Sequence, residues 1–201
     1  MPSLLKIDWL GAMAEFMDED AIVDAVETAE ASGDCAAVVE LLGRALDLEE
    51  PETALEAAAD ALLRLGGDKA RRPALGDAGA CARVAAALQA HGGDEASLAE
   101  VLLGCCRVLC ADCAENAAKL LAADGVAALV SAMSAHAAAG EPTLQEQGCL
   151  TVEALAIAGG AAAREALLAA DAEAAVEAAR ADIVNERNKS YPDRALTALK
   201  A

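Results

Sequence analysis

The sequence predicts an all-α protein built from repeated helical units, and three observations support this fold class. The 201 residues include 56 alanines and 27 leucines, both strong helix formers, but only three aromatic residues. A β-sandwich or barrel would need many more β-branched and aromatic residues. The hydrophobic share of 56% is high enough to build a core, which excludes a disordered chain. The sequence also repeats with a period of about 46 residues, which is typical of helical solenoids.

The repeat is visible in the sequence itself. Gly33-Asp34-Cys35-Ala36-Ala37-Val38 recurs as Gly79-Ala80-Cys81-Ala82-Arg83-Val84, then as Gly125-Val126-Ala127-Ala128-Leu129-Val130, and again from Ala172. Apolar positions further along each unit follow the same shift. We therefore expect an armadillo-like repeat domain over residues 33–201, with units near 33–78, 79–124, 125–171 and 172–201.

Each unit is predicted to contain the same helices in the same order. A first helix spans 34–47, 80–90, 126–138 and 173–183 in successive units. A loop rich in Gly, Pro, Asp and Asn ends it. A longer helix follows at 52–65, 97–111, 143–158 and 193–200, and a short one at 69–75, 114–122 and 161–169. Gly79 and Gly125 follow short helices, where glycine is expected to take the left-handed conformation.

The long helices carry one apolar stripe. In the second unit it consists of Leu98, Val101, Leu102, Cys105, Val108 and Leu109, at helical spacing. We expect the residues off this stripe to form an exposed face along the long helices. They are Asp60, Arg64, Leu103, Cys106, Arg107, Cys110, Gln147, Glu153 and Ile157.

The phrases from Asn116 to Val130 and from Leu144 to Leu150 resemble the consensus of the armadillo repeat family. The resemblance covers about four-fifths of the chain, although HEAT repeats share its stacked-helix logic. It implies a right-handed superhelix whose long third helices line a concave groove, and a eukaryotic scaffold that binds other proteins there. Armadillo proteins that bind extended peptides carry Trp and Asn on these helices, and this chain does not. A partner helix or a folded surface therefore fits the groove better than an extended basic peptide.

Residues 1–32 do not follow the repeat register. They hold an apolar series that consists of Leu4, Leu5, Ile7, Trp9, Leu10, Met13 and Phe16. One interpretation is an N-terminal helical cap that covers the first repeat, because solenoids need capped ends. The other is a partner-binding arm in which Trp9 and Phe16 are the anchors, because aromatic residues are enriched in binding hot spots.

Charge is unevenly distributed along the chain. The formal net charge is −19, and residues 1–60 contain 16 acids but only Lys6 and Arg44. This balance disfavours nucleic-acid binding, and the basic residues Lys69, Arg71 and Arg72 are too few to reverse it. The acidic end either keeps helix faces solvated or steers a partner that has a basic surface.

No motif in the sequence predicts catalysis. A phosphate loop, a Gly-x-Ser-x-Gly elbow and a His-Glu-x-x-His motif are absent. Cys105, Cys106, Cys110 and Cys113 have partial metal-ligand spacing, but small core-filling residues explain them more simply. His91 and His136 occupy equivalent positions at the ends of helices, where they would act as C-terminal caps. We expect no cofactor and no metal.

The sequence therefore predicts a non-catalytic scaffold or adaptor. Its partner would be a protein with a basic surface or an amphipathic helix. The expected contact residues are Trp9, Phe16, Asp60, Arg64, Leu103, Arg107, Gln147, Glu153 and Ile157. The main alternative is a permanent structural subunit of an axonemal, organellar or membrane complex, and a cysteine-based metal or redox protein is a third. No secretory or transmembrane segment is expected, which favours an intracellular, cytoplasmic location, with an organellar or ciliary assembly left open.

Overall fold

The computed structural model describes residues 17–201, and within this range the chain is helical without strands. The all-α prediction is confirmed. The twelve helices are α2 (Glu19–Ser32), α3 (Cys35–Ala45), α4 (Glu52–Gly67), α5 (Arg72–Asp77), α6 (Ala80–His91), α7 (Ala96–Cys110), α8 (Ala114–Ala122), α9 (Gly125–Ala135), α10 (Pro142–Ala158), α11 (Gly160–Ala169), α12 (Ala172–Ala179) and α13 (Tyr191–Lys200).

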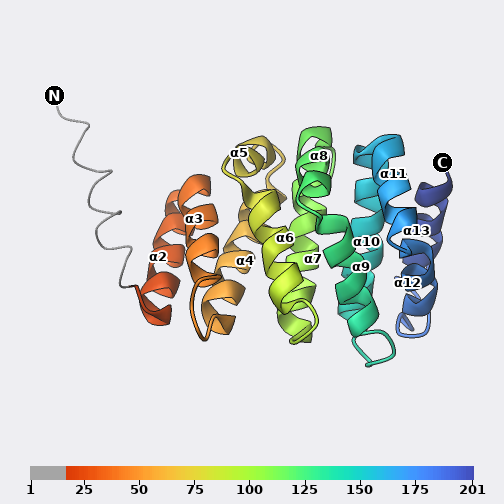
Figure 1. The fold of residues 1–201 in the computed structure, drawn as a ribbon, viewed down its shortest axis with the longest axis horizontal. Coiled ribbons are helices and arrows are strands. Elements are labelled where there is room, and N and C mark those ends of the chain that lie inside the picture. Colours follow the sequence, from red (N-terminus) through yellow and green to blue (C-terminus); the bar gives the residue numbers. More distant parts are fainter. Residues whose placement is uncertain (1–16) are drawn as a thin grey trace.

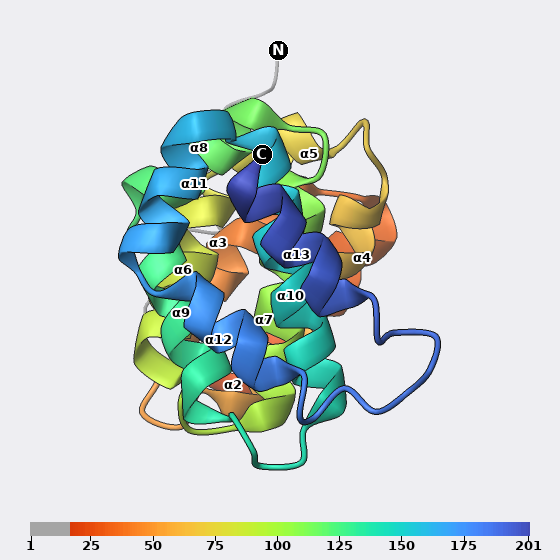
Figure 2. The same cartoon turned by 90° about the vertical axis from the view of Figure 1, so that its right-hand side faces the viewer.

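The helices stand side by side in rows that follow the order of the sequence (Figure 1). One row contains α2, α4, α7, α10 and α13, each packed on the next, and we call it the long-helix row. A second row contains α3, α6, α9 and α12. The short helices α5, α8 and α11 form a third row at one end of the other two (Figure 2). Within the long-helix row, each helix therefore packs mainly on the helix one unit away.

Helix α2 takes the first position in the long-helix row. It packs on α4 as α4 packs on α7, although the repeat comparison began only at residue 33. The Glu19 carboxylate accepts hydrogen bonds from the amides of Thr53 (3.0 Å) and Ala54 (3.3 Å). These amides begin α4, where the preceding Pro51 supplies no side-chain cap. A residue of α2 thus satisfies the free donors at the start of the next helix in the row.

One predicted cap was assigned to the wrong residue. Gly79 adopts the left-handed conformation with φ of 95°, as expected. At the next unit, however, Asp124 takes it with φ of 56°, and Gly125 is already the first residue of α9. Aspartate tolerates this conformation because its short polar side chain can bond locally to the backbone. Glycine is needed at 125 for space, because a Cβ there would lie 2.5 Å from Leu120.

Small residues let the rows approach closely. The side of α4 that faces its neighbours is lined by the fully buried residues Ala54, Ala58, Ala59 and Ala61. A Cβ placed on Gly66 would lie 2.7 Å from the side chain of Val108, which belongs to the next unit. The alanine-rich composition is therefore a packing requirement as well as a helix signal.

Buried polar side chains link helices that lie far apart in the sequence. The Asn116 amide of α8 donates to the carbonyls of Arg72 (2.8 Å) and Leu109 (3.0 Å). The Thr151 hydroxyl of α10 donates to the carbonyl of Leu103 in α7 (2.9 Å). A buried hydrogen bond of this kind is costly to break, because the carbonyl left behind has no water to replace its partner.

Within residues 17–201, no single helix has the length and apolar composition needed to cross a bilayer. Only α8 and α9 taken together meet that test, and the two are bent by 78° relative to each other.

Candidate functional site

The surface of the long-helix row holds most of the residues that the sequence predicted as contacts. Asp60 and Arg64 lie on α4, Arg107 lies on α7, and Gln147, Glu153 and Ile157 lie on α10. Each of these six side chains is at least partly exposed. Trp9 and Phe16 lie outside the described residues. The six divide into two clusters, one at α2 and α4 and one at α7, α10 and α13.

The first cluster is an ion-pair network centred on Arg64. Its guanidinium pairs with Glu30 of α2, with 2.8 Å between Nη2 and Oε2, and with Asp60 one turn away at 3.5 Å. The hydrogen bond from Arg64 lowers the pKa of the Glu30 carboxyl, and the same bond raises the pKa of Arg64. Because the Arg64 side chain is 56% exposed, water screens the pair and its contribution to stability is small.

The second cluster surrounds a hollow of about 260 Å³ between α7, α10 and α13. Arg107, Glu153 and Ile157 line it, together with Arg194 of α13. Ile157 is 67% exposed, which is unusual for a large apolar side chain within residues 17–201. The fold thus brings together three of the contact residues predicted from the sequence, namely Arg107, Glu153 and Ile157.

The charged groups of this hollow are held in fixed positions. Arg107 Nε donates to the Gln147 side-chain oxygen (3.0 Å). Arg194 pairs with Glu153 at 2.7 Å, and its guanidinium lies 5.6 Å from the centre of the Tyr191 ring. Among the described residues, Arg107 forms no ion pair with an acid. Its positive charge is therefore available to a ligand.

The local charge of the hollow differs from that of the whole chain. Arg107 and Arg194 line it together with the acids Asp112 and Glu153, and Lys69 pairs with Asp112 at 3.1 Å. Three bases thus meet two acids at this point on a protein whose net charge is −19. The hollow therefore carries a local excess of positive charge.

Sequence reasoning missed Arg194. Its signal was present, because Arg194 lies 47 residues after Gln147 and occupies the same repeat position. The sequence predicts Gln147 as a contact because it lies off the apolar stripe of a complete unit. The last unit is incomplete, because it contains only its first and long helices. The contact surface predicted from the sequence therefore ends at the third unit.

Three residues predicted to lie off the apolar stripe are buried. Leu103, Cys106 and Cys110 have no exposed surface, so none of them can contact a partner. The reason is the central position of α7, which packs on α4 and on α10 and also touches α5, α6 and α8. A helix enclosed on several sides buries more than one stripe. The expectation that Cys106 points away from the core was therefore wrong.

Five of the seven cysteines behave as core residues. Within residues 17–201, no three His, Cys, Asp or Glu side chains are placed to hold a metal ion. Burial raises the pKa of Cys81 to about 11 and that of Cys149 to about 12, and it also raises the pKa of Cys105, Cys106 and Cys110. Such thiols stay protonated at neutral pH, which makes them poor nucleophiles and poor metal ligands.

His136 links two units. Its ring Nε2 lies 3.1 Å from the carbonyl of Gly92, at the end of α6. Only 8% of the His136 residue surface is exposed. The residue therefore contacts the carboxyl end of the preceding helix in its row, in addition to ending its own helix.

No known family model matches the chain, and no curated protein matches it either.

Proposed function

We propose that this protein is a non-catalytic binding module, an armadillo-like solenoid that captures a partner protein on its long-helix row. The 46-residue repeat and the stacked order of the rows support the solenoid. The observation that carries the binding role is the hollow at Ile157, where an exposed apolar side chain lies close to two arginines. Arginine is enriched among residues that dominate binding energy.

The chemistry of the surface defines the partner. The hollow fits an apolar side chain with carboxylates beside it, which would pack on Ile157 and pair with Arg107 and Arg194. The other half of the row, at α2 and α4, lies within the strongly acidic part of the chain and fits basic residues. The proposed ligand is therefore an amphipathic helix or folded surface with acidic and basic residues at opposite ends.

The test is capture of partners by the tagged full chain from its native cell, followed by identification of the captured proteins. Ile157→Asp should weaken capture at least tenfold, because loss of a hot-spot contact costs about 2 kcal/mol. Arg64→Glu combined with Arg107→Glu should also weaken it while leaving the helix content unchanged. The matched control is Leu168→Asp, which changes an exposed leucine on α11, outside the long-helix row.

Capture of the same partner by the Ile157→Asp variant and by the unaltered chain would refute the assignment of this surface. Equal loss in the Leu168→Asp control would show that the effect is not specific to the long-helix row.

A further inference from the structure

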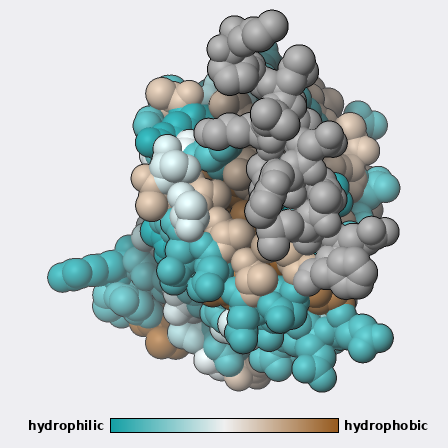
Figure 3. Space-filling model, turned by 90° about the vertical axis from the view of Figure 1, so that its left-hand side faces the viewer, coloured by the Kyte–Doolittle hydropathy of each residue, from teal (hydrophilic) through white to brown (hydrophobic). Residues whose placement is uncertain are grey.

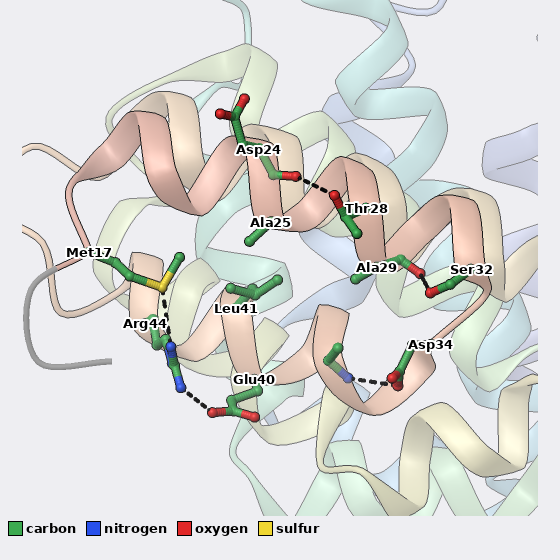
Figure 4. A pocket seen from close by; sticks show the side chains of 11 residues that line it. Met17, Asp24, Ala25, Thr28, Ala29, Ser32, Asp34, Glu40, Leu41 and Arg44 are labelled. Carbon is green, nitrogen blue, oxygen red and sulfur yellow. Dashed lines mark hydrogen bonds and ion pairs between the residues drawn. The ribbon is translucent and has the colours of Figure 1, made fainter. Parts of the chain in front are cut away.

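The N-terminal end of the stack contains an open groove. It has a volume of about 410 Å³ and lies between the outer faces of α2 and α3 (Figure 4). Apolar side chains form its floor, namely Met17, Ala25, Ala29, Ala37 and Leu41, and most of the exposed groove surface is apolar. Asp24, Asp34 and Glu40 stand at its rim. Figure 3 shows this end of the molecule, where apolar atoms are visible between hydrophilic ones.

The position of the groove in the rows explains why it is apolar. Helix α4 is covered by α2 on one side and by α7 on the other, and α6 is covered by α3 and α9. Helices α2 and α3 are the first of their rows, so among the described residues each has a stacking neighbour on one side only. A stack of helical units needs a covering element at such an end.

We propose that residues 4–16 of the same chain occupy this groove. Leu5, Trp9, Met13 and Phe16 are spaced four, four and three residues apart, which places them on one face of an α-helix. Thirteen helical residues extend about 20 Å, close to the length of the 14-residue helix α2. The segment can therefore cover the groove along its whole length.

The connection at Met17 favours this occupant over any other. Met17 lines the groove and directly follows the segment, so no linker separates the two. The Arg44 Nη1 atom lies 3.2 Å from the Met17 sulfur, and Arg44 also pairs with Glu40 on the rim. A directly attached segment reaches its site at a high effective concentration, which a separate protein cannot match at ordinary concentrations.

The segment offers one cation, Lys6, to the acidic rim, so apolar contact and not charge is the main attraction in the groove. On a helix with this apolar face, Lys6 lies along one edge and Asp8 and Glu15 lie along the other. Lys6 is the only basic residue before Arg44. Rim acids stand on both sides of the groove, Asp24 on α2 and Glu40 on α3, so Lys6 can approach an acid in either orientation of the segment.

Trp9 makes the proposal directly measurable, because it is the only tryptophan in the chain. In the full-length protein its emission should be blue-shifted, and acrylamide should quench it several-fold less than it quenches a free peptide of residues 1–16. Ala25→Arg, on the groove floor, should shift the emission to the red and restore quenching. The matched control is Ala118→Arg, at an exposed alanine of α8, and it should change neither quantity.

Four outcomes separate the alternatives. Shielding of Trp9 in a monomer, lost in Ala25→Arg and kept in Ala118→Arg, supports the proposal. A fully exposed Trp9 in the native chain overturns it and favours a free partner-binding arm. Shielding that grows with protein concentration overturns it in favour of a second copy as the occupant. Shielding of Trp9 that persists in Ala25→Arg overturns the proposal, because the segment then lies outside the groove.

Far-UV circular dichroism of each variant shows whether the fold is intact. Release of the segment can itself unfold its thirteen residues, so a helix loss up to that size is expected. If Ala25→Arg loses more helix than this, Thr28→Arg replaces it, because Thr28 is exposed at the mouth of the same groove. The same four outcomes then apply to that variant.

Discussion

Replacement of Gly76 by alanine tests the close packing between units. Gly76 lies on α5, and a Cβ there would overlap the Asn116 side-chain oxygen and come within 2.6 Å of the Asn116 Cγ. Asn116 has no exposed surface, and its amide holds two carbonyls from two other elements. Either Asn116 stays and the core is overpacked, or it moves and both hydrogen bonds are lost. Each route costs about 1 to 3 kcal/mol.

Alanine has a higher helix propensity than glycine, which offsets this cost by up to about 1 kcal/mol. We therefore expect Gly76→Ala to lower the free energy of unfolding by about 1 to 2 kcal/mol. The matched control is Gly43→Ala on α3, where a Cβ would lie 2.6 Å from the guanidinium of the exposed Arg83. Since an exposed side chain can swing away, Gly43→Ala should be neutral or stabilising.

The assay is urea unfolding monitored by far-UV circular dichroism. The unfolding free energies are compared between variants that have the same m-value, the slope of free energy against urea concentration. A double-mutant cycle with Asn116→Ala sharpens the result, because removal of the Asn116 side chain also removes the clash. The double variant should be no less stable than Asn116→Ala alone. Full additivity of the two losses, or a Gly76→Ala protein as stable as the original, would refute the contact between these residues.

Three further predictions concern titratable groups. Cys35 and Cys113, the two half-buried cysteines, should react with a thiol reagent in the native protein, whereas the other five should react only after unfolding; rapid reaction of all seven would contradict the buried positions. Burial raises the pKa of Cys81 to about 11, so its contribution to stability is complete below the usual thiol value of about 8.5 and is lost as the pH rises towards 11. Cys81→Ala should therefore lose less stability than the original chain between pH 8 and pH 10 in urea unfolding, and an identical loss would argue against this cause. Burial and two neighbouring acids raise the pKa of Glu100, so Glu100→Gln should raise the midpoint of urea unfolding at pH 7 but not at pH 4, and a gain at both values would point to another origin.

The positions of the helices could be predicted from the sequence, because Gly, Pro and Asp mark their ends and the 46-residue period repeats those marks. The exposed face of α7, by contrast, could not be predicted from the sequence. Burial of Leu103 and Cys106 depends on how closely α4 and α10 approach from opposite sides, and periodicity within one helix does not contain that information. The pairing of Asn116 with Gly76 was equally hidden, because it depends on the packing of α8 on α5.

The role of α2 was missed for a different reason. Helix α2 precedes Gly33, where the first copy of the repeated pattern begins, so the repeat starts after it. Its buried residues Ile22, Val26 and Ala29 nevertheless have the spacing of a stacking helix. A search for apolar spacing alone, without the repeat motif, would have indicated one further helix in the row.

We propose that the partner binds at the long-helix row around Ile157. The most direct test places a photo-crosslinking amino acid at Ile157 of the full chain in its native cell, and a second, separately, at Val184, which is 71% exposed in the loop after α12. We predict a discrete crosslinked partner from position 157 and none from position 184. A partner crosslinked from position 184 but not from position 157 would contradict the claim.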